Sequence, residues 1–377
     1  MSMEKTNILY QKTFSQKKGT KFRGGKITPS IPLSKIVSLL IIPLIIFFAA
    51  SCSPTKNIEN EVLSAVPLQK YKSIEYSNFT KARELLGLTN IRHTSSMRDK
   101  IAFFSAVDNF IFSMGEISFL LSEEASLGFD PSDFKTKVVA NTAAHSVMVV
   151  TGSFSRAAII ERLNAYNYRK ENYNGYTLYS LPLTNALMKG GLPLTFSNLA
   201  FVNESTIAHA PTIGLLKNYI DGLKTDTLSS DEDILKIVNE VGDVTSFYIS
   251  SAITAAELYG KNSLMNRSPE DWGISDYRLS PYTYFAFGIR PMETGKEQDI
   301  VLVIYYPDEE SAKRDKNLLK EGLTKGKGLS GLTPLSELFS VRSVSVKGNV
   351  LKARLKTKDG FDIKLLISLR DLPFLVY

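Results

Sequence analysis

The strongest constraint on this chain is an uncharged apolar run over residues 36–50, which ends just before Cys52, the only cysteine of the 377-residue sequence. A basic head, a short apolar stretch and small residues before a peptidase cleavage site are the parts of an export signal. As a helix the run would span about 22 Å at about 1.5 Å per residue, less than the roughly 30 Å of a bilayer core. Pro43 would also interrupt that helix. The sequence therefore predicts a signal segment over 1–51, with a basic head over 1–35 and an apolar part over 36–51. An uncleaved anchor and a buried helix are the alternatives.

Small residues directly before a lone cysteine resemble the signal of a bacterial lipoprotein, in which that cysteine is lipidated and becomes the mature N-terminus. This resemblance implies that Cys52 carries an acyl chain such as palmitate, which makes the membrane a partner. It also implies a membrane-anchored, extracytoplasmic protein of the cell envelope, in the periplasm or at the cell surface. Once Cys52 is assigned, the rest of the chain holds no cysteine for a disulfide or a thiolate metal site.

The charge of the chain is concentrated in the predicted signal. Residues 1–51 contain eight basic residues and one acidic residue, so their net charge of +7 equals that of the whole chain. Residues 52–377 are therefore neutral. A basic head agrees with the positive-inside bias of membrane topology. A nucleic-acid-binding protein needs a basic surface on its folded part, and we expect no nucleic-acid partner here.

The exported part is predicted to fold as α+β. Polar residues over 52–67 indicate a tether, and the roughly 310 residues that follow are enough for two subdomains. We expect a first α+β subdomain over 68–250 and a second over 251–377. The order strand–helix–strand–strand recurs near 147–209 and 300–355. This predicts two related subdomains, each a mostly antiparallel sheet with helices packed on one face.

Periodicity and capping residues predict the individual elements. Apolar residues at a spacing near 3.6 predict a long helix over 96–124. Ser155 and Ser230 are predicted to cap the helices that follow them, and further helices are expected over 79–86 and from Pro211 and Pro307. The expected strands are 71–77, 147–150, 176–181, 199–203, 206–209, 244–250, 282–289, 300–306, 341–346, 350–355 and 361–369.

One stretch carries a second resemblance. Residues 149–154 read Val-Val-Thr-Gly-Ser-Phe and precede a predicted helix, after which 173–179 read Tyr-Asn-Gly-Tyr-Thr-Leu-Tyr and 205–210 read Ser-Thr-Ile-Ala-His-Ala. This order is similar to uncharacterised bacterial extracytoplasmic lipoproteins. In these, a strand ending in a T-G-x-F turn precedes a helix and a Y-x-G-Y-x-(I/L)-Y strand. The resemblance covers about 147–225 and implies no catalytic residue.

The motifs of metal, nucleotide and hydrolase sites are missing from the sequence. His93, His145 and His209 lie far apart and form no paired-histidine motif. The acidic run 231–233 could hold a cation such as calcium, but helix capping explains it without one. There is no GxSxG, and the glycines over 326–331 lack the spacing of a phosphate-binding loop. We therefore predict no catalytic, cofactor-binding or metal-binding residue.

Aromatic residues are the remaining candidates for binding. Tyr173, Tyr176 and Tyr179 fall in the densest tyrosine cluster, and Trp272 is the only tryptophan. Such side chains suit an interface with an envelope protein or a glycan, although they are also ordinary half-buried strand residues. The leading hypothesis is a membrane-anchored binding or structural protein of the envelope. The alternatives are a carrier of a hydrophobic ligand, with helix 96–124 lining its cavity, and an envelope hydrolase, which needs a cleft that joins a serine, a histidine and a carboxylate.

Overall fold

The computed structural model describes residues 63–69, 71–108, 110–111, 127–128, 130–142, 145–182, 196–252, 278–292, 297–327, 333–358 and 361–364. The chain divides into two compact units, 1–53 and 54–377, and every described residue belongs to the second. The predicted signal segment, Cys52 and Trp272 therefore lie outside the described residues. No helix in the described part of the chain is both long and apolar enough to span a membrane.

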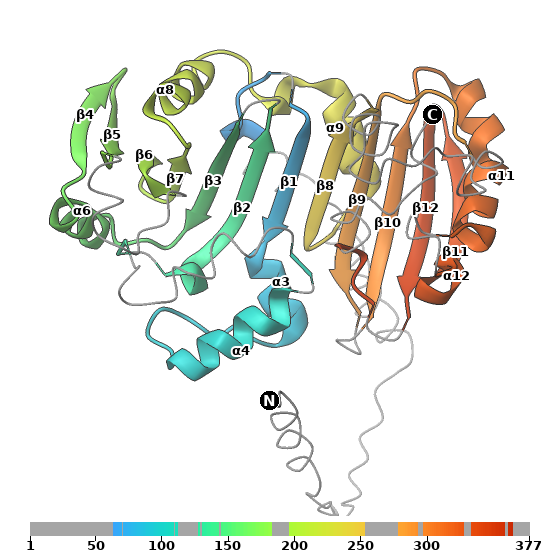
Figure 1. Cartoon of the computed structure of the whole chain (residues 1–377), viewed down its shortest axis with the longest axis horizontal. Helices are drawn as coiled ribbons and strands as arrows, with labels where there is room; N and C mark the ends of the chain where they lie inside the picture. The colour runs from blue at the N-terminus through green and yellow to red at the C-terminus, as the bar shows by residue number, and fades with distance from the viewer. Residues whose placement is uncertain are drawn as a thin grey trace, which may run out of the picture. The chain divides into compact units, whose positions relative to one another are not determined.

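The α+β class is confirmed. In the described part of the chain, twelve strands form one sheet in which neighbouring strands run antiparallel, in the order β11-β12-β10-β9-β8-β1-β2-β3-β7-β6-β5-β4 (Figure 1). The strands are β1 Ser73–Asn78, β2 Phe134–Asn141, β3 Ser146–Gly152, β4 Arg169–Tyr173, β5 Tyr176–Ser180, β6 Asn198–Asn203, β7 Thr206–His209, β8 Ser246–Ser251, β9 Tyr284–Pro291, β10 Gln298–Tyr305, β11 Phe339–Lys347 and β12 Val350–Thr357. The described α-helices are α3 Phe79–Leu86, α4 Met97–Asp108, α6 Arg156–Ala165, α8 Ile213–Gly222, α9 Glu232–Val241, α11 Glu309–Lys325 and α12 Leu335–Leu338.

Five strands have the same spatial order in both halves of the described sheet, and β5 and β4 extend the first half beyond them. In the first half β1, β2 and β3 are followed in space by β7 and then β6, and in the second β8, β9 and β10 are followed by β12 and then β11. Helix α6 leaves β3 as α11 leaves β10. The first strands of the halves, β1 and β8, pair with each other, so both halves form one continuous sheet. Strand β8, the first strand of the second half, begins at Ser246.

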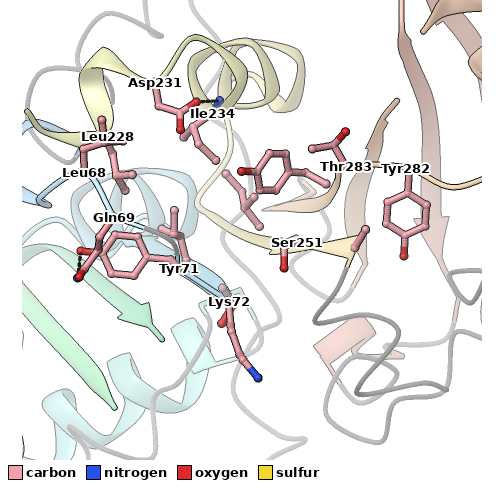
Figure 2. A pocket seen from close by; sticks show the side chains of 15 residues that line it. Leu68, Gln69, Tyr71, Lys72, Leu228, Asp231, Ile234, Ser251, Tyr282 and Thr283 are labelled. Atoms are coloured by element: carbon pink, nitrogen blue, oxygen red, sulfur yellow. Dashed lines mark hydrogen bonds between the residues drawn. The ribbon is translucent and has the colours of Figure 1, made fainter. Parts of the chain in front are cut away.

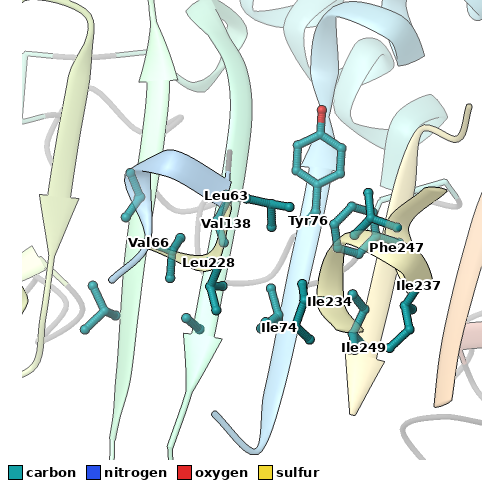
Figure 3. Packing of buried hydrophobic residues seen from close by; sticks show 14 of the residues in the cluster. Leu63, Val66, Ile74, Tyr76, Val138, Leu228, Ile234, Ile237, Phe247 and Ile249 are labelled. Atoms are coloured by element: carbon teal, nitrogen blue, oxygen red, sulfur yellow. The ribbon is translucent and has the colours of Figure 1, made fainter. Parts of the chain in front are cut away.

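The helices cover both faces of the sheet rather than one. The register pairs Tyr76 with Val138 and with Phe247, and all three belong to the core beneath α8 and α9 (Figure 3). On the other face Glu75 lies between a core packed by α3, α4 and α6 and a core packed by α11 and α12. Both faces need a cover because the central strands are apolar on both sides. For example, Val149 and Val150 of β3 are 3 % and 1 % exposed.

The predicted tether extends too far into the body. A short 3-10 helix, η1 (Leu63–Ala65), places Leu63 at 0 % exposure, and Val66 is 1 % exposed in the core under α8 and α9. The tyrosine Tyr219 of α8 donates a hydrogen bond to the carbonyl of Ala65 at 2.8 Å. The folded body therefore includes residues from Leu63 onward, because apolar side chains in this stretch have a buried surface to pack against.

The prediction of one helix over 96–124 is wrong. Helix α4 ends at Asp108, and Phe110 and Ile111 follow in a turn and a bend, while 112–126 lie outside the described residues. The adjacent side chains of Phe110 and Ile111 enter different cores, one packed by α11 and the other by α4. The Phe110 carbonyl accepts hydrogen bonds from the hydroxyls of Thr245 and Ser246 at 3.1 and 2.8 Å. These hydrogen bonds come from Ser246 of β8 and from Thr245, the residue before it. They take the place of the backbone hydrogen bond that a continued helix would give the Phe110 carbonyl.

Candidate functional site

A largely apolar hollow in the described part of the chain lies between the sheet and the start of α9. It has a volume of about 650 Å³ and sits where β1 and β9 begin and β8 ends (Figure 2). Small-molecule sites typically measure about 300–1,000 Å³. The lining residues are Leu68, Gln69, Tyr71, Lys72, Ser73, Ile74, Leu228, Asp231, Ile234, Ile249, Ser251, Ala252, Tyr282, Thr283 and Tyr284. We call this hollow the junction pocket, because strands from both halves line it.

The floor and roof of the junction pocket are apolar. Ile74 of β1 and Ile249 of β8 are directly paired in the register, and both point to the face that α9 covers. Ile234, in the first turn of α9, and Leu228, in the short 3-10 helix η5 (Leu228–Ser230), close the opposite side. Leu68 is 41 % exposed, which is unusual for a large apolar side chain in this body. The pocket can therefore hold an apolar group and has an apolar residue at its edge.

Asp231 is the acidic residue that lines the junction pocket, and only one of its two carboxylate oxygens accepts hydrogen bonds from described residues. Its Oδ1 atom accepts hydrogen bonds from the backbone amides of Asp233 and Ile234, both at 3.0 Å, which makes Asp231 the N-cap of α9. The predicted cap, Ser230, instead donates its hydroxyl to the Thr227 carbonyl at 2.8 Å. The Oδ2 atom of Asp231 has no hydrogen-bond or ion-pair partner among the described residues.

Two tyrosines of the junction pocket differ in how their hydroxyls are used. The Tyr71 hydroxyl donates to the Pro67 carbonyl at 3.0 Å and accepts from Gln69 at 2.7 Å, and burial raises its pKa to about 12. The Tyr284 hydroxyl has no hydrogen-bond partner among the described residues. Burial raises the pKa of Tyr284, and the negative charge of Asp231 raises it further. Tyr71 is thus part of the wall, while Tyr284 keeps a neutral hydroxyl for another partner.

A second hollow, of about 900 Å³, contains the only histidine–carboxylate contact among the described residues. The Nδ1 atom of His93 lies 2.9 Å from Oδ2 of Asp133, and the His93 amide donates to Oδ1 of the same carboxylate at 3.3 Å. Ser153 and Ser155 line this cleft with them, and Ser155 caps α6 by accepting from Ala158 at 3.3 Å. Neither serine is hydrogen-bonded to His93 in the described structure. The sequence did not reveal this pairing, because forty residues separate the two partners.

The other two histidines lie elsewhere. His209 ends β7 and is 5 % exposed, with its Nδ1 atom 2.9 Å from the Asn198 carbonyl. His145 lies just before β3, where its amide and carbonyl bond to Thr142 at 3.3 and 2.8 Å. Within the described ranges no group of three or more His, Cys, Asp or Glu side chains has the arrangement of a metal site.

The candidate interface tyrosines do not share one surface. Tyr179 is 1 % exposed and packs edge-on against Phe201 at 5.9 Å between ring centroids, so its side chain belongs to the core. Tyr173 and Tyr176 are half-buried on the opposite face, and the Tyr173 hydroxyl donates to Asp221 at 2.7 Å. The alternation of strand side chains separates Tyr176 from Tyr179.

Comparison with known proteins identifies no family for this chain. No family model matches it, and no curated protein matches it. Solved structures of TP0453 are similar in fold at low identity. Crystal form I has 9 % identity and a TM-score of 0.40, covering 84 % of this chain and 97 % of that chain. Crystal form IV has 10 % identity and a TM-score of 0.43, covering 81 % and 96 %. A likeness of this size carries no argument about function.

Proposed function

We propose that this chain is a membrane-anchored, extracytoplasmic lipoprotein of the cell envelope whose folded body binds a small hydrophobic or amphipathic ligand in the junction pocket. The observation that carries the ligand proposal is the apolar hollow of about 650 Å³ between the sheet and α9. The anchor proposal rests on the sequence around Cys52. Ligand binding at the junction pocket joins two hypotheses drawn from the sequence, an envelope binding protein and a carrier.

The volume of the junction pocket is large enough for an alkyl chain to bind with a favourable free energy. Transfer of one methylene from water to an apolar site contributes about 0.8 kcal/mol, so ten methylenes contribute about 8 kcal/mol. That figure corresponds to a dissociation constant of about 1 μM before the cost of immobilising the ligand. The carrier hypothesis assigned the lining to helix 96–124, and this is wrong for the junction pocket, because α4 packs on the other face of the sheet.

The ligand proposal is tested by photo-crosslinking in the membrane. The full chain in nanodiscs is exposed to a long-chain alkyl probe that carries a diazirine and an alkyne, and labelled peptides are identified by mass spectrometry. We expect labels on the segments around Tyr71, Ile234 and Tyr284, which line the pocket. An Ile74→Trp variant should reduce labelling by filling the hollow, whereas Val301→Trp, under the same face but away from the pocket, should not reduce it. Labelling spread evenly over the surface would contradict the proposal.

The anchor proposal is tested at the mature N-terminus. Mass spectrometry of the protein from membranes should find a chain that begins at an acylated Cys52. Cys52→Ala should abolish the acylation, and Ser53→Ala, one residue further on, should leave it intact. A full-length N-terminus with an unmodified Cys52 in the wild type would contradict lipidation.

A second candidate function, an envelope hydrolase, is favoured by one observation. The cleft that pairs His93 with Asp133 at 2.9 Å is also lined by Ser153 and Ser155. A serine activated by a carboxylate-oriented histidine is the basis of acyl-transfer hydrolysis. A fluorophosphonate probe should then label one of these serines. His93→Gln should abolish this labelling, and His145→Gln should leave it unchanged. Absence of labelling in the wild type would remove this candidate.

A further inference from the structure

We propose that the junction pocket selects its ligand by head group: it takes an amphipathic molecule whose head is a hydroxyl or an ammonium, bound between Asp231 Oδ2 and the Tyr284 hydroxyl, and it rejects an anionic head. This inference rests on the proposed function, since it specifies the ligand of the same pocket. It starts from two residues that line the hollow, Asp231 and Tyr284, each of which has an oxygen atom without a hydrogen-bond partner among the described residues.

The Asp231 carboxylate is held in one orientation before a ligand arrives. Two backbone amides bind its Oδ1 atom at 3.0 Å, so rotation of the carboxylate would break both cap hydrogen bonds. The remaining oxygen, Oδ2, is an acceptor only, because an ionised carboxylate carries no proton. Figure 2 shows Asp231 at the start of α9, joined to Ile234 by the cap hydrogen bond, within the ring of lining residues. The head of a ligand here must therefore donate a hydrogen bond.

The Tyr284 hydroxyl adds the complementary group. A neutral phenol both donates and accepts, and the raised pKa of Tyr284 keeps its proton on at neutral pH. A ligand hydroxyl can donate to Asp231 and accept from Tyr284, which satisfies all three groups. A ligand ammonium can donate to both and gains a charge-assisted bond to the carboxylate. An anionic head could accept only from Tyr284 and would face the negative charge of Asp231.

The surrounding charges reinforce this preference. Asp233, two residues beyond Asp231, accepts a hydrogen bond from Tyr305 at 2.5 Å and adds a second negative charge near Tyr284. Lys236, a cation on the same helix α9, is bound to the Asn349 side chain and lies over the Tyr305 ring at 5.2 Å. Lys72 also lines the pocket, but its ammonium points away from Asp231 in Figure 2. The polar end of the pocket is therefore negative, although its lining holds one acidic and one basic residue.

The test compares three diazirine probes of equal chain length, an alkyl alcohol, an alkyl amine and a permanently anionic alkyl sulfonate, on the full chain in nanodiscs of zwitterionic lipid. We expect the alcohol and the amine to label the pocket segments and the sulfonate to label them at least about tenfold less, the factor that loss of one charged hydrogen bond gives. Asp231→Asn keeps a cap oxygen and should lower amine labelling about tenfold. Tyr284→Phe should lower alcohol labelling.

Matched controls separate recognition from folding. Asp308→Asn makes the same exchange at the N-cap of α11, where Asp308 accepts from the Ser311 amide at 2.7 Å away from the pocket, and should leave all labelling unchanged. Tyr176→Phe is the control for Tyr284→Phe. Equal labelling by the sulfonate, or undiminished amine labelling in Asp231→Asn, would overturn the head-group inference while the ligand site stands. If none of the three probes labels the pocket segments, the proposed function itself fails.

Discussion

His209 makes a specific prediction about how stability depends on pH. Its ring is 5 % exposed at the end of β7, next to Phe196 at 5.1 Å between ring centroids. Burial lowers its pKa to about 4, because a charged imidazolium loses its hydration there, and the hydrogen bond with the Asn198 carbonyl opposes this only in part. The unfolded chain has an ordinary histidine pKa of about 6.5.

The sign follows from proton binding. Between about pH 6.5 and pH 4 the unfolded state binds a proton at His209 and the folded state does not, so acid favours unfolding. The contribution of His209 to stability is therefore fully present above about pH 6.5 and is lost as the pH falls toward 4. At about 1.4 kcal/mol for each pH unit, a difference from 6.5 to about 4 corresponds to about 3 kcal/mol.

Urea denaturation followed by circular dichroism measures this contribution. We expect the difference in free energy of unfolding between the wild type and His209→Gln to change by about 3 kcal/mol between pH 7 and pH 4. Glutamine keeps an N–H for the Asn198 carbonyl but does not titrate. Carboxylates that also lose stability in acid, such as Glu240, cancel in the comparison. His145→Gln controls for the exchange of imidazole for amide. Parallel curves for the wild type and His209→Gln would refute the reasoning.

Two glycines and one buried acid give further predictions, each read from urea denaturation at neutral pH. Gly288→Ala should cost about 1–3 kcal/mol, because the new Cβ would lie 2.5 Å from Cγ1 of Val241 in α9. Gly214→Ala, the matched exchange in α8, should stabilise by about 0.5–1 kcal/mol, since its Cβ meets nothing closer than 4.0 Å. An equal loss in both would contradict the packing argument. Asp315→Ala should cost about 2–4 kcal/mol, because this 0 % exposed carboxylate accepts from Tyr306 at 3.0 Å and from a loop serine. A loss under about 0.5 kcal/mol would contradict that role.

The sequence predicted the ends of a helix correctly where neighbouring residues determine them. Helix α3 has the predicted bounds, 79–86, because a helix-forming run is followed by Gly87 at a φ of 67°, which ends it. Ser155 caps α6 as predicted. Strand β2 was missed, although it lies at the centre of the sheet. Its Lys137 is 0 % exposed, so a basic residue stands where the pattern of a buried strand requires an apolar one.

The junction pocket could not be predicted from the sequence, because no local pattern contains it. Its lining comes from four stretches, 68–74, 228–234, 249–252 and 282–284, which only the folded sheet brings together. Asp231 was recognised as part of an acidic helix start. The hydrogen bonds of the preceding 3-10 turn then decided that it, rather than Ser230, became the cap. The sequence therefore indicated the acidic residue at the pocket but not which of its two oxygens accepts the cap hydrogen bonds.

The repeated strand order accounts for the continuous sheet, and helix α9 accounts for the position of the pocket. Between β7 and β8 the chain forms α8 and α9. Helix α9 belongs to a core that contains Ile74 of the first half and Val303 of the second, so it covers the junction of the halves. The start of that helix leaves Asp231 above the ends of β1 and β8. If the proposed ligand binds there, it contacts both halves at once, because strands β1, β8 and β9 all contribute lining residues.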